Sequence, residues 1–148
     1  MQDAVVSRKV SQKDAESFFA RMPKALPIFR DLEGSILAMH PDTEIRMLKT
    51  QVTFGNGLGF AYAWLPIRKV KGRPDNYLVL SLGLPYFIDS PRIKEASEPY
   101  PGIWMHHLII DSPEAIDAQL IGWIDLAYRF ALARAAKKTP GASHQGSS

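Results

Sequence analysis

The 148-residue sequence contains no cysteine, and this absence removes several kinds of chemistry at once. Disulfides, thiolate zinc sites, iron–sulfur clusters and a cysteine nucleophile are all excluded. No apolar run approaches the roughly 18 residues of a membrane-spanning helix, so we expect no contact with a membrane. The first ten residues lack an apolar signal core and a small-residue cleavage site. These absences favour a cytoplasmic location, and we expect neither a metal site nor a cofactor.

Motifs that mark common catalytic sites are also missing. The sequence has no Gly-x-Ser-x-Gly elbow, no His-Glu-x-x-His zinc helix and no suitable pair of carboxylates. The glycine-rich stretch Gly55–Gly59 is followed by a strand pattern, whereas a dinucleotide site requires a helix at that point. Its Asn56-Gly57 pair instead predicts a β-hairpin with a type I′ turn.

Charge of one sign is only slightly in excess, with a formal net charge of +3. Four basic residues are concentrated in the loop after the second predicted strand: Arg68, Lys69, Lys71 and Arg73. A solvated loop is the simpler interpretation of such a cluster, so nucleic-acid binding is the less favoured alternative.

The elements that are present predict an α+β protein with a single domain over residues 11–136. Residues 1–10 are expected to form a flexible lead-in, and residues 137–148 a disordered tail. Apolar stripes predict two N-terminal helices, one from Ser11 to Pro23 with Ser11 as its cap, and one over about 24–39. A C-terminal helix, opened by Ser112 and Pro113, runs to about residue 136 and packs on one face of the sheet.

Between these helices the sequence predicts an antiparallel sheet of four to five strands. Residues 43–54, 59–66 and 76–84 have strand patterns, residues 104–110 form a further strand, and a bulge is expected near Leu48–Lys49. A short helix is predicted over Ser90–Ala96. The proline-containing segment Pro85–Gly102 is expected to fold across the sheet face that faces away from the helices. We call that side the open face.

Side-chain alternation assigns the strand residues to the two faces. Ala61 and Ala63 are small enough for a helix to approach, so they are placed under the helices together with Leu65. Three rings are placed on the open face: Phe60, Tyr62 and Trp64. Gly34, in the second helix, is interpreted as a point of close contact with the sheet. His106 is assigned to the core side and His107 to the open face.

The open face and the segment predicted to cross it carry all the candidate site residues. These are Lys49, Gln51, Tyr62, Trp64, Ser81, Tyr86, Arg92 and His107. A lysine among aromatic rings can bind an anion or hold a planar ligand, so a small-molecule binding module is the leading hypothesis. A solvated face with scattered rings is the bland alternative. A docking surface for another protein or for a second copy of the chain is also open. An enzyme in which His107 exchanges protons beside Lys49 is a further alternative.

Several stretches together resemble the bacterial family catalogued as domain of unknown function 5655. They are Ser17-Phe18-Phe19, Leu26-Pro27-Ile28-Phe29, Lys49-Thr50-Gln51-Val52-Thr53-Phe54, Ser90-Pro91-Arg92-Ile93, Pro101-Gly102-Ile103-Trp104-Met105-His106-His107 and the helix Asp117 to Trp123. The resemblance covers about Ala15 to Ala135. It implies a layout similar to YdhG-like families, some of which look frataxin-like, and implies no activity. An iron-loading surface would need clustered carboxylates, and the first helix offers only Asp14 and Glu16.

Overall fold

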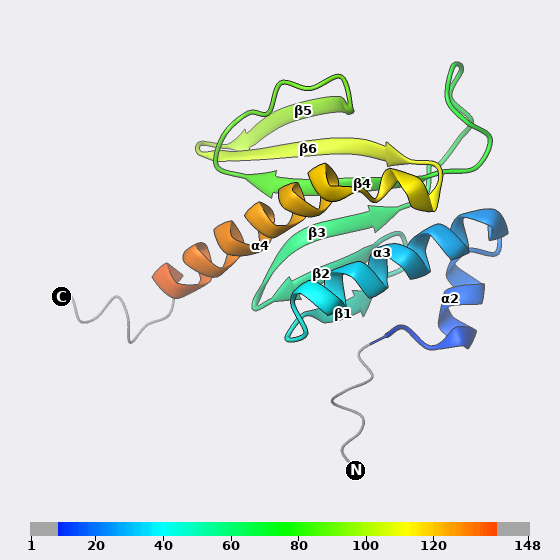
Figure 1. Cartoon of the computed structure of the whole chain (residues 1–148), viewed down its shortest axis with the longest axis horizontal. Helices are drawn as coiled ribbons and strands as arrows, with labels where there is room; N and C mark the ends of the chain where they lie inside the picture. The colour runs from blue at the N-terminus through cyan, green and yellow to red at the C-terminus, as the bar shows by residue number, and fades with distance from the viewer. Residues whose placement is uncertain (1–8, 139–148) are drawn as a thin grey trace, which may run out of the picture.

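The computed structural model describes residues 9–138, which form one six-stranded antiparallel sheet with its helices on one side (Figure 1). The elements are α2 (Gln12–Phe18), η1 (Pro23–Ala25), α3 (Leu26–Met39), β1 (Glu44–Met47), β2 (Val52–Asn56), β3 (Leu58–Trp64), β4 (Leu78–Leu84), β5 (Ile93–Tyr100), β6 (Ile103–Ile110), η2 (Pro113–Ala115) and α4 (Ala118–Lys138). The strand order is β1-β2-β3-β4-β6-β5. The predicted α+β class with an antiparallel sheet and a C-terminal helix is confirmed, but the prediction of four to five strands was wrong.

The two chain ends extend beyond the described part of the structure. Most of the predicted lead-in and tail lie there, while α4 continues through the first two residues of the predicted tail, to Lys138. Between residues 9 and 138, no helix is both long and apolar enough to cross a membrane.

Helices α2 and α4 each begin at a side chain that accepts from a free backbone N–H group. Ser11 Oγ accepts from the backbone N–H of Asp14 at 3.1 Å, so the predicted cap of α2 is confirmed. Ser112 makes no such cap, and Pro113 opens only the short 3₁₀ helix η2. Asp117 caps α4 instead, because its Oδ1 accepts from the backbone N–H of Leu120 at 3.0 Å.

The predicted first strand is in fact two strands joined by a tight turn. The backbone N–H of Leu48 donates to the carbonyl of Gln51 at 2.8 Å, and Met47 pairs with Val52 across the resulting hairpin. The loss of alternation near Leu48 marks this turn, so the predicted bulge there was wrong. The turn adds one strand to the sheet and places Lys49 at its tip and Gln51 at its end.

A bulge occurs one hairpin later, between β2 and β3. Phe54 pairs with Ala61 while Gly55 pairs with Gly59, so Phe60 is an extra residue without an opposite partner. The bulge turns Phe60 towards the helices, where it is 1% exposed and its ring lies 5.4 Å from that of Tyr128 on α4. The placement of Phe60 on the open face was therefore wrong.

The hairpin itself is confirmed, but its type I′ turn is not. That turn needs positive φ at two residues, and the only positive φ at this hairpin belongs to Gly57, at 86°. No residue other than glycine has positive φ in the described chain, so Asn56 does not have the predicted conformation.

The segment Pro85–Gly102 also differs from expectation. The predicted helix over Ser90–Ala96 is replaced by β5, which pairs with β6 alone and forms one edge of the sheet. Before β5, the backbone N–H of Ile88 donates to Nε2 of His106 at 2.9 Å. His106 pairs with the core residue Leu82, so the part of this segment before β5 covers the helix side. The rest extends the sheet at its edge as β5, and the prediction that the segment crosses the open face was wrong.

The core lies between the sheet and helices α3 and α4. The apolar stripe of α3 packs there with that of α4, and all seven residues of β4 are buried. Ala61 and Ala63 lie under the helices as predicted, fully buried. Because α3 and α4 cover the same face (Figure 1), the open face is left for the candidate site.

Candidate functional site

A row of polar side chains runs across the open face, with one residue from each of five neighbouring strands. Register pairs Thr53 with Tyr62, Tyr62 with Ser81, Ser81 with His107, and His107 with Glu95. Residues directly opposite each other on neighbouring strands share a face and lie within side-chain reach. The pairing therefore places these five side chains in one line from β2 to β5.

Two hydrogen bonds join Trp64, Ser81 and His107 within this region. The Trp64 indole Nε1–H donates to Ser81 Oγ at 2.9 Å, and Ser81 Oγ lies 2.6 Å from His107 Nδ1. An indole N–H can only donate, so the Ser81 hydroxyl accepts from Trp64 and has its own proton free for Nδ1. This arrangement fits the neutral imidazole that carries its proton on Nε2, with Nδ1 as the acceptor for the Ser81 hydroxyl.

Burial also favours the neutral form of the His107 imidazole. Desolvation lowers the pKa of His107 below its ordinary value, while the nearby charge of Glu95 opposes the shift. At neutral pH His107 therefore presents an Nε2–H donor on the side away from Ser81.

The 2.6 Å contact resembles a serine nucleophile with its base, but its surroundings do not suit that chemistry. An attacking oxygen must come within about 3–3.5 Å of the substrate carbon. Ser81 is only 3% exposed, and its oxygen already accepts from Trp64. Ser81 is best understood as the residue that fixes Trp64 and His107 in place.

A cavity of about 380 Å³ lies beside Trp64, and we call it the Lys49 cavity. It is lined by Phe18, Arg21, Lys49, Thr50, Gln51, Trp64, Leu65 and Ile67. Lys49 and Arg21 are its only charged lining residues, so the charge on its wall is entirely positive. A neighbouring cavity of about 570 Å³ shares Phe18, Arg21 and Lys49 with it and also contains Asp14.

Arg21 was not among the residues predicted for the site. Its guanidinium donates to the backbone carbonyls of Leu65 and Pro66, the two residues that follow β3 in the chain. The chain turns after α2, which ends at Phe18, five residues before the predicted stop at Pro23. No local pattern marks Arg21, because its position depends on that turn and on the distant end of β3.

The structure groups Trp64 with four other predicted site residues, through a shared cavity or through hydrogen bonds, and separates the remaining three. Lys49, Gln51 and Trp64 line one cavity, and hydrogen bonds link Trp64 to Ser81 and His107. The Tyr62 ring turns away over Gly59, where an added Cβ would lie 2.6 Å from the Tyr62 hydroxyl. Tyr86 belongs to the segment that covers the helix side, and it lines neither the Lys49 cavity nor the cavity around His107.

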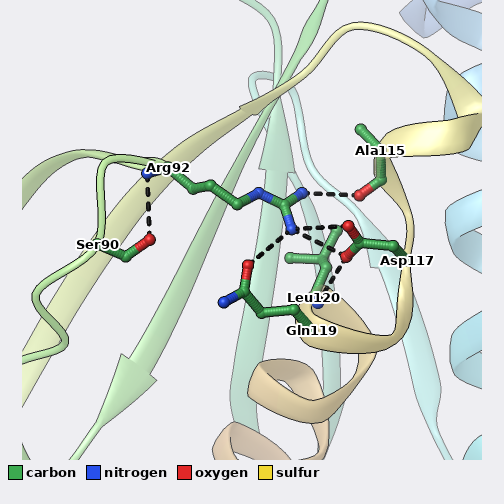
Figure 2. Close-up of polar contacts among 6 residues, drawn as sticks. All are labelled: Ser90, Arg92, Ala115, Asp117, Gln119 and Leu120. Carbon is green, nitrogen blue, oxygen red and sulfur yellow. Dashed lines mark hydrogen bonds and ion pairs between the residues drawn. The ribbon is translucent and has the colours of Figure 1, made fainter.

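Arg92 has a different set of partners, which Figure 2 shows. Its Nη1 donates to both carboxylate oxygens of Asp117, at 2.8 and 3.1 Å, and to Gln119 Oε1 at 3.1 Å. Its Nη2 donates to the carbonyl of Ala115 at 2.8 Å. The backbone N–H of Leu120 and Arg92 together lower the pKa of the Asp117 carboxyl. Arg92 therefore ties the start of β5 to the first turn of α4, and it lines a cavity separate from that of Lys49.

The donor set argues against a metal centre at this face. Across residues 9–138, no three His, Asp or Glu side chains are grouped so that they could hold a metal ion. The chemistry available around Trp64 consists mainly of cations, N–H donors and a ring surface, which are groups that suit an anion, with Glu95 as the one carboxylate among the residues that share a cavity with it.

Fold and site together define an α+β domain in which α3 and α4 cover one face of an antiparallel sheet. The Trp64–Ser81–His107 contacts lie on the other face, and the Lys49 cavity lies between the end of β3 and the end of α2. A family model described as "Domain of unknown function (DUF5655)" matches residues 15–131, so the chain belongs to this family. The match confirms the resemblance expected from the Lys-Thr-Gln and Trp-x-His-His segments. No curated protein and no solved structure matches the chain.

Proposed function

We propose that this protein binds a small organic anion with a planar or apolar body in the Lys49 cavity. The observation that carries the proposal is the composition of the cavity wall. It joins two cations, Lys49 and Arg21, to an apolar surface made by Phe18, Leu65, Trp64 and Ile67, with no carboxylate among its lining residues.

The two cations are available to a ligand. Arg21 donates to backbone carbonyls, which neutralise no charge. No carboxylate lies within ion-pair distance of Lys49 or Arg21 in the described structure, whereas Arg30, Arg92 and Arg129 all have carboxylate partners. A partly enclosed site strengthens the attraction between such cations and an anion, because less water screens it.

The Trp64 indole supplies a surface on which a ligand can pack, and the Gln51 amide supplies an oriented hydrogen-bonding group. Trp64 is fixed by its bond to Ser81, so a ligand that packs on the indole does not have to order it first. Gln51 Nε2 donates to Thr53 Oγ1 at 3.2 Å, which orients the amide beside the cavity. A volume of about 380 Å³ suits a compact ligand such as an aromatic carboxylate or phosphate monoester.

A thermal-shift screen with benzoate, indole-3-acetate and phenyl phosphate tests the proposal. We expect at least one of these anions to raise Tm, since a ligand that binds only the folded state stabilises it. In Lys49→Met the affinity of that anion should fall about tenfold, as expected when a charged hydrogen bond is lost. Lys24→Met is the matched control, because Lys24 is exposed and lines none of these cavities.

Three outcomes would overturn the proposal. One is that no anion in the screen shifts Tm. Another is that Lys49→Met and Lys24→Met weaken binding equally, which would show a general effect of net charge. The third is that Lys49→Met leaves affinity unchanged but alters the sedimentation coefficient. That result would assign this surface to self-association, with the exposed Ile67 at the rim of the cavity as a contact.

A further inference from the structure

Beyond Trp64, the open face continues into a second recess that the proposed function does not use. A small cavity of about 90 Å³ is lined by Trp64, Arg73, Val79, Lys94, Glu95, His107, Leu108 and Ile109. A larger one of about 530 Å³ is lined by Gly72, Arg73, Pro74, Pro91, Arg92, Lys94, Ile109, Asp111 and Ala115. The two share Arg73, Lys94 and Ile109, and we call the pair the Arg73 recess. Trp64 is the wall between this recess and the Lys49 cavity.

Two cations of this recess lack a carboxylate partner. Within residues 9–138, no Asp or Glu lies at ion-pair distance from Arg73 or Lys94. The guanidinium of Arg73 lies 6.0 Å from the centre of the Tyr77 ring, a contact that orients it without neutralising it. By contrast, the nearby Lys69 pairs with Asp75 at 3.2 Å.

His107 supplies a third donor to the same recess. Ser81 occupies its Nδ1, so the imidazole presents Nε2–H, and His107 lines the 90 Å³ cavity together with both cations. Arg73 comes from the loop before β4, Lys94 from β5 and His107 from β6, so the sheet assembles the three donors from separate parts of the chain. Arg92 contributes little to the recess, because Asp117, Gln119 and Ala115 already accept from it.

We infer that the Arg73 recess is a second anion site, which takes a compact oxyanion of the size and chemistry of phosphate. Arg73 and Lys94 supply the positive charge, and His107 Nε2–H donates a directed hydrogen bond. A phosphate has enough acceptor oxygens to meet three donors at once, and guanidinium and ammonium groups are its usual partners in proteins. A space of about 90 Å³ equals about three water molecules, which suits a small oxyanion rather than an aromatic ring.

Two carboxylates oppose this assignment and make it testable. Glu95 lines the small cavity and Asp111 the large one. Glu95 pairs with His107 across the strands and is the acid closest to the three donors. Removing its charge should therefore strengthen binding of the oxyanion, whereas removing either cation should weaken it.

The test is a titration of ¹⁵N-labelled protein with inorganic phosphate at pH 7.5, followed through the imidazole signals of His107. Sodium chloride of equal ionic strength serves as the reference. We expect saturable shifts of the His107 signals with phosphate. The affinity should fall about tenfold in Arg73→Gln and in Lys94→Gln, and rise a few-fold in Glu95→Gln. Lys71→Gln, in the same basic loop but outside both cavities, should behave as wild type.

Several results would overturn the inference. The His107 signals could move no more with phosphate than with chloride, or Lys71→Gln could weaken binding as much as Arg73→Gln. Weaker binding in Glu95→Gln would likewise contradict the assigned geometry. Lys49→Met separates the two sites, since it should weaken organic-anion binding about tenfold and leave the phosphate titration unchanged. Circular dichroism of each variant excludes unfolding as the cause.

Discussion

His106 and His107 are neighbours in the chain, yet they lie on opposite faces of β6. Burial lowers the pKa of both, chiefly through the loss of water around the charged form. His106 is fully buried, and its Nε2 accepts from the backbone N–H of Ile88, an acceptor that protonation would remove. His107 would lose its acceptor role towards Ser81 in the same way.

The two histidines predict a loss of stability in mild acid. Their unfolded forms take up a proton near the ordinary pKa of 6.5, while the folded forms do so only at lower pH. Since the unfolded state then binds more protons, their contribution to stability is complete above about pH 6.5 and is lost as pH falls below it. We expect Tm to fall between pH 7.5 and 5.5, and to fall less in His107→Asn, whose side-chain oxygen can replace Nδ1 as the acceptor for Ser81.

Scanning calorimetry across this range checks the prediction. Carboxylates such as Asp117 and Asp125, whose pKa values are lowered, do not titrate above pH 5.5 and cannot mimic the effect. A Tm that stays constant would show that the histidines do not control acid stability, and an identical pH profile in His107→Asn would exclude a contribution from His107.

For individual residues, the alternation of side chains along a strand predicted many positions in the sheet, but not all of them. It placed His106 towards the core, and His107, Ser81 and Trp64 on the open face, because a strand with one buried face fixes the direction of every second side chain. It could not predict the bond from Trp64 to Ser81, which depends on the register between β3 and β4. Nor could it find Arg21 or Arg73 as neighbours of the site, since both come from irregular segments.

Glycines show how the same residue serves different purposes in different elements. Gly34 lies inside α3, and an added Cβ would meet nothing within 4 Å, so the expected close contact with the sheet is absent. Gly55 lies at the bulge of β2, where an added Cβ would come within 2.8 Å of the backbone oxygen of Leu58. A backbone atom cannot move aside as a flexible side chain can.

This contrast predicts opposite signs for one substitution. Gly34→Ala should stabilise the protein by about 0.5–1 kcal/mol, because alanine restricts the unfolded chain and favours the helix. Gly55→Ala should destabilise it by about 1–3 kcal/mol, the usual range for a local clash. Urea unfolding of both variants measures the difference, and a destabilising Gly34→Ala would show that α3 is packed more closely there than the structure indicates.

The strands that the sequence did not predict have little strand pattern of their own, although each pairs with its immediate neighbour in the chain. β5 has the sequence IKEASEPY, which is polar and contains a proline, so it has little strand pattern of its own. It becomes a strand because β6 pairs with it on one side. The turn between β1 and β2 contains no glycine or proline, and only the break in alternation at Leu48 pointed to it. The three main helices, by contrast, carry their apolar stripes within one segment, so their existence was predicted, although α2 ends earlier and α4 begins later than expected.

For the molecule as a whole, the two edges of the sheet are unequal. β1 has four residues, whereas β5 has eight and carries charged side chains and Pro99 along an exposed edge. Charges and proline on an edge strand discourage pairing with another chain. The fold class was predictable because the order of helices and strands determines it, while the strand number was not, because it depended on β5 and the turn after β1.

The burial of β4 along its whole length has a consequence for how the molecule opens. Both neighbours of β4 bond to its backbone, α4 packs on it from one side, and the Trp64–Ser81–His107 contacts lie over it on the other. Its amide hydrogens can exchange with solvent only when most of the sheet separates. We expect the slowest hydrogen exchange in β4, at a free energy close to that of global unfolding, and the fastest strand exchange in β1 and β5. Deuterium uptake measured by mass spectrometry would reveal this gradient from the centre of the sheet to its edges.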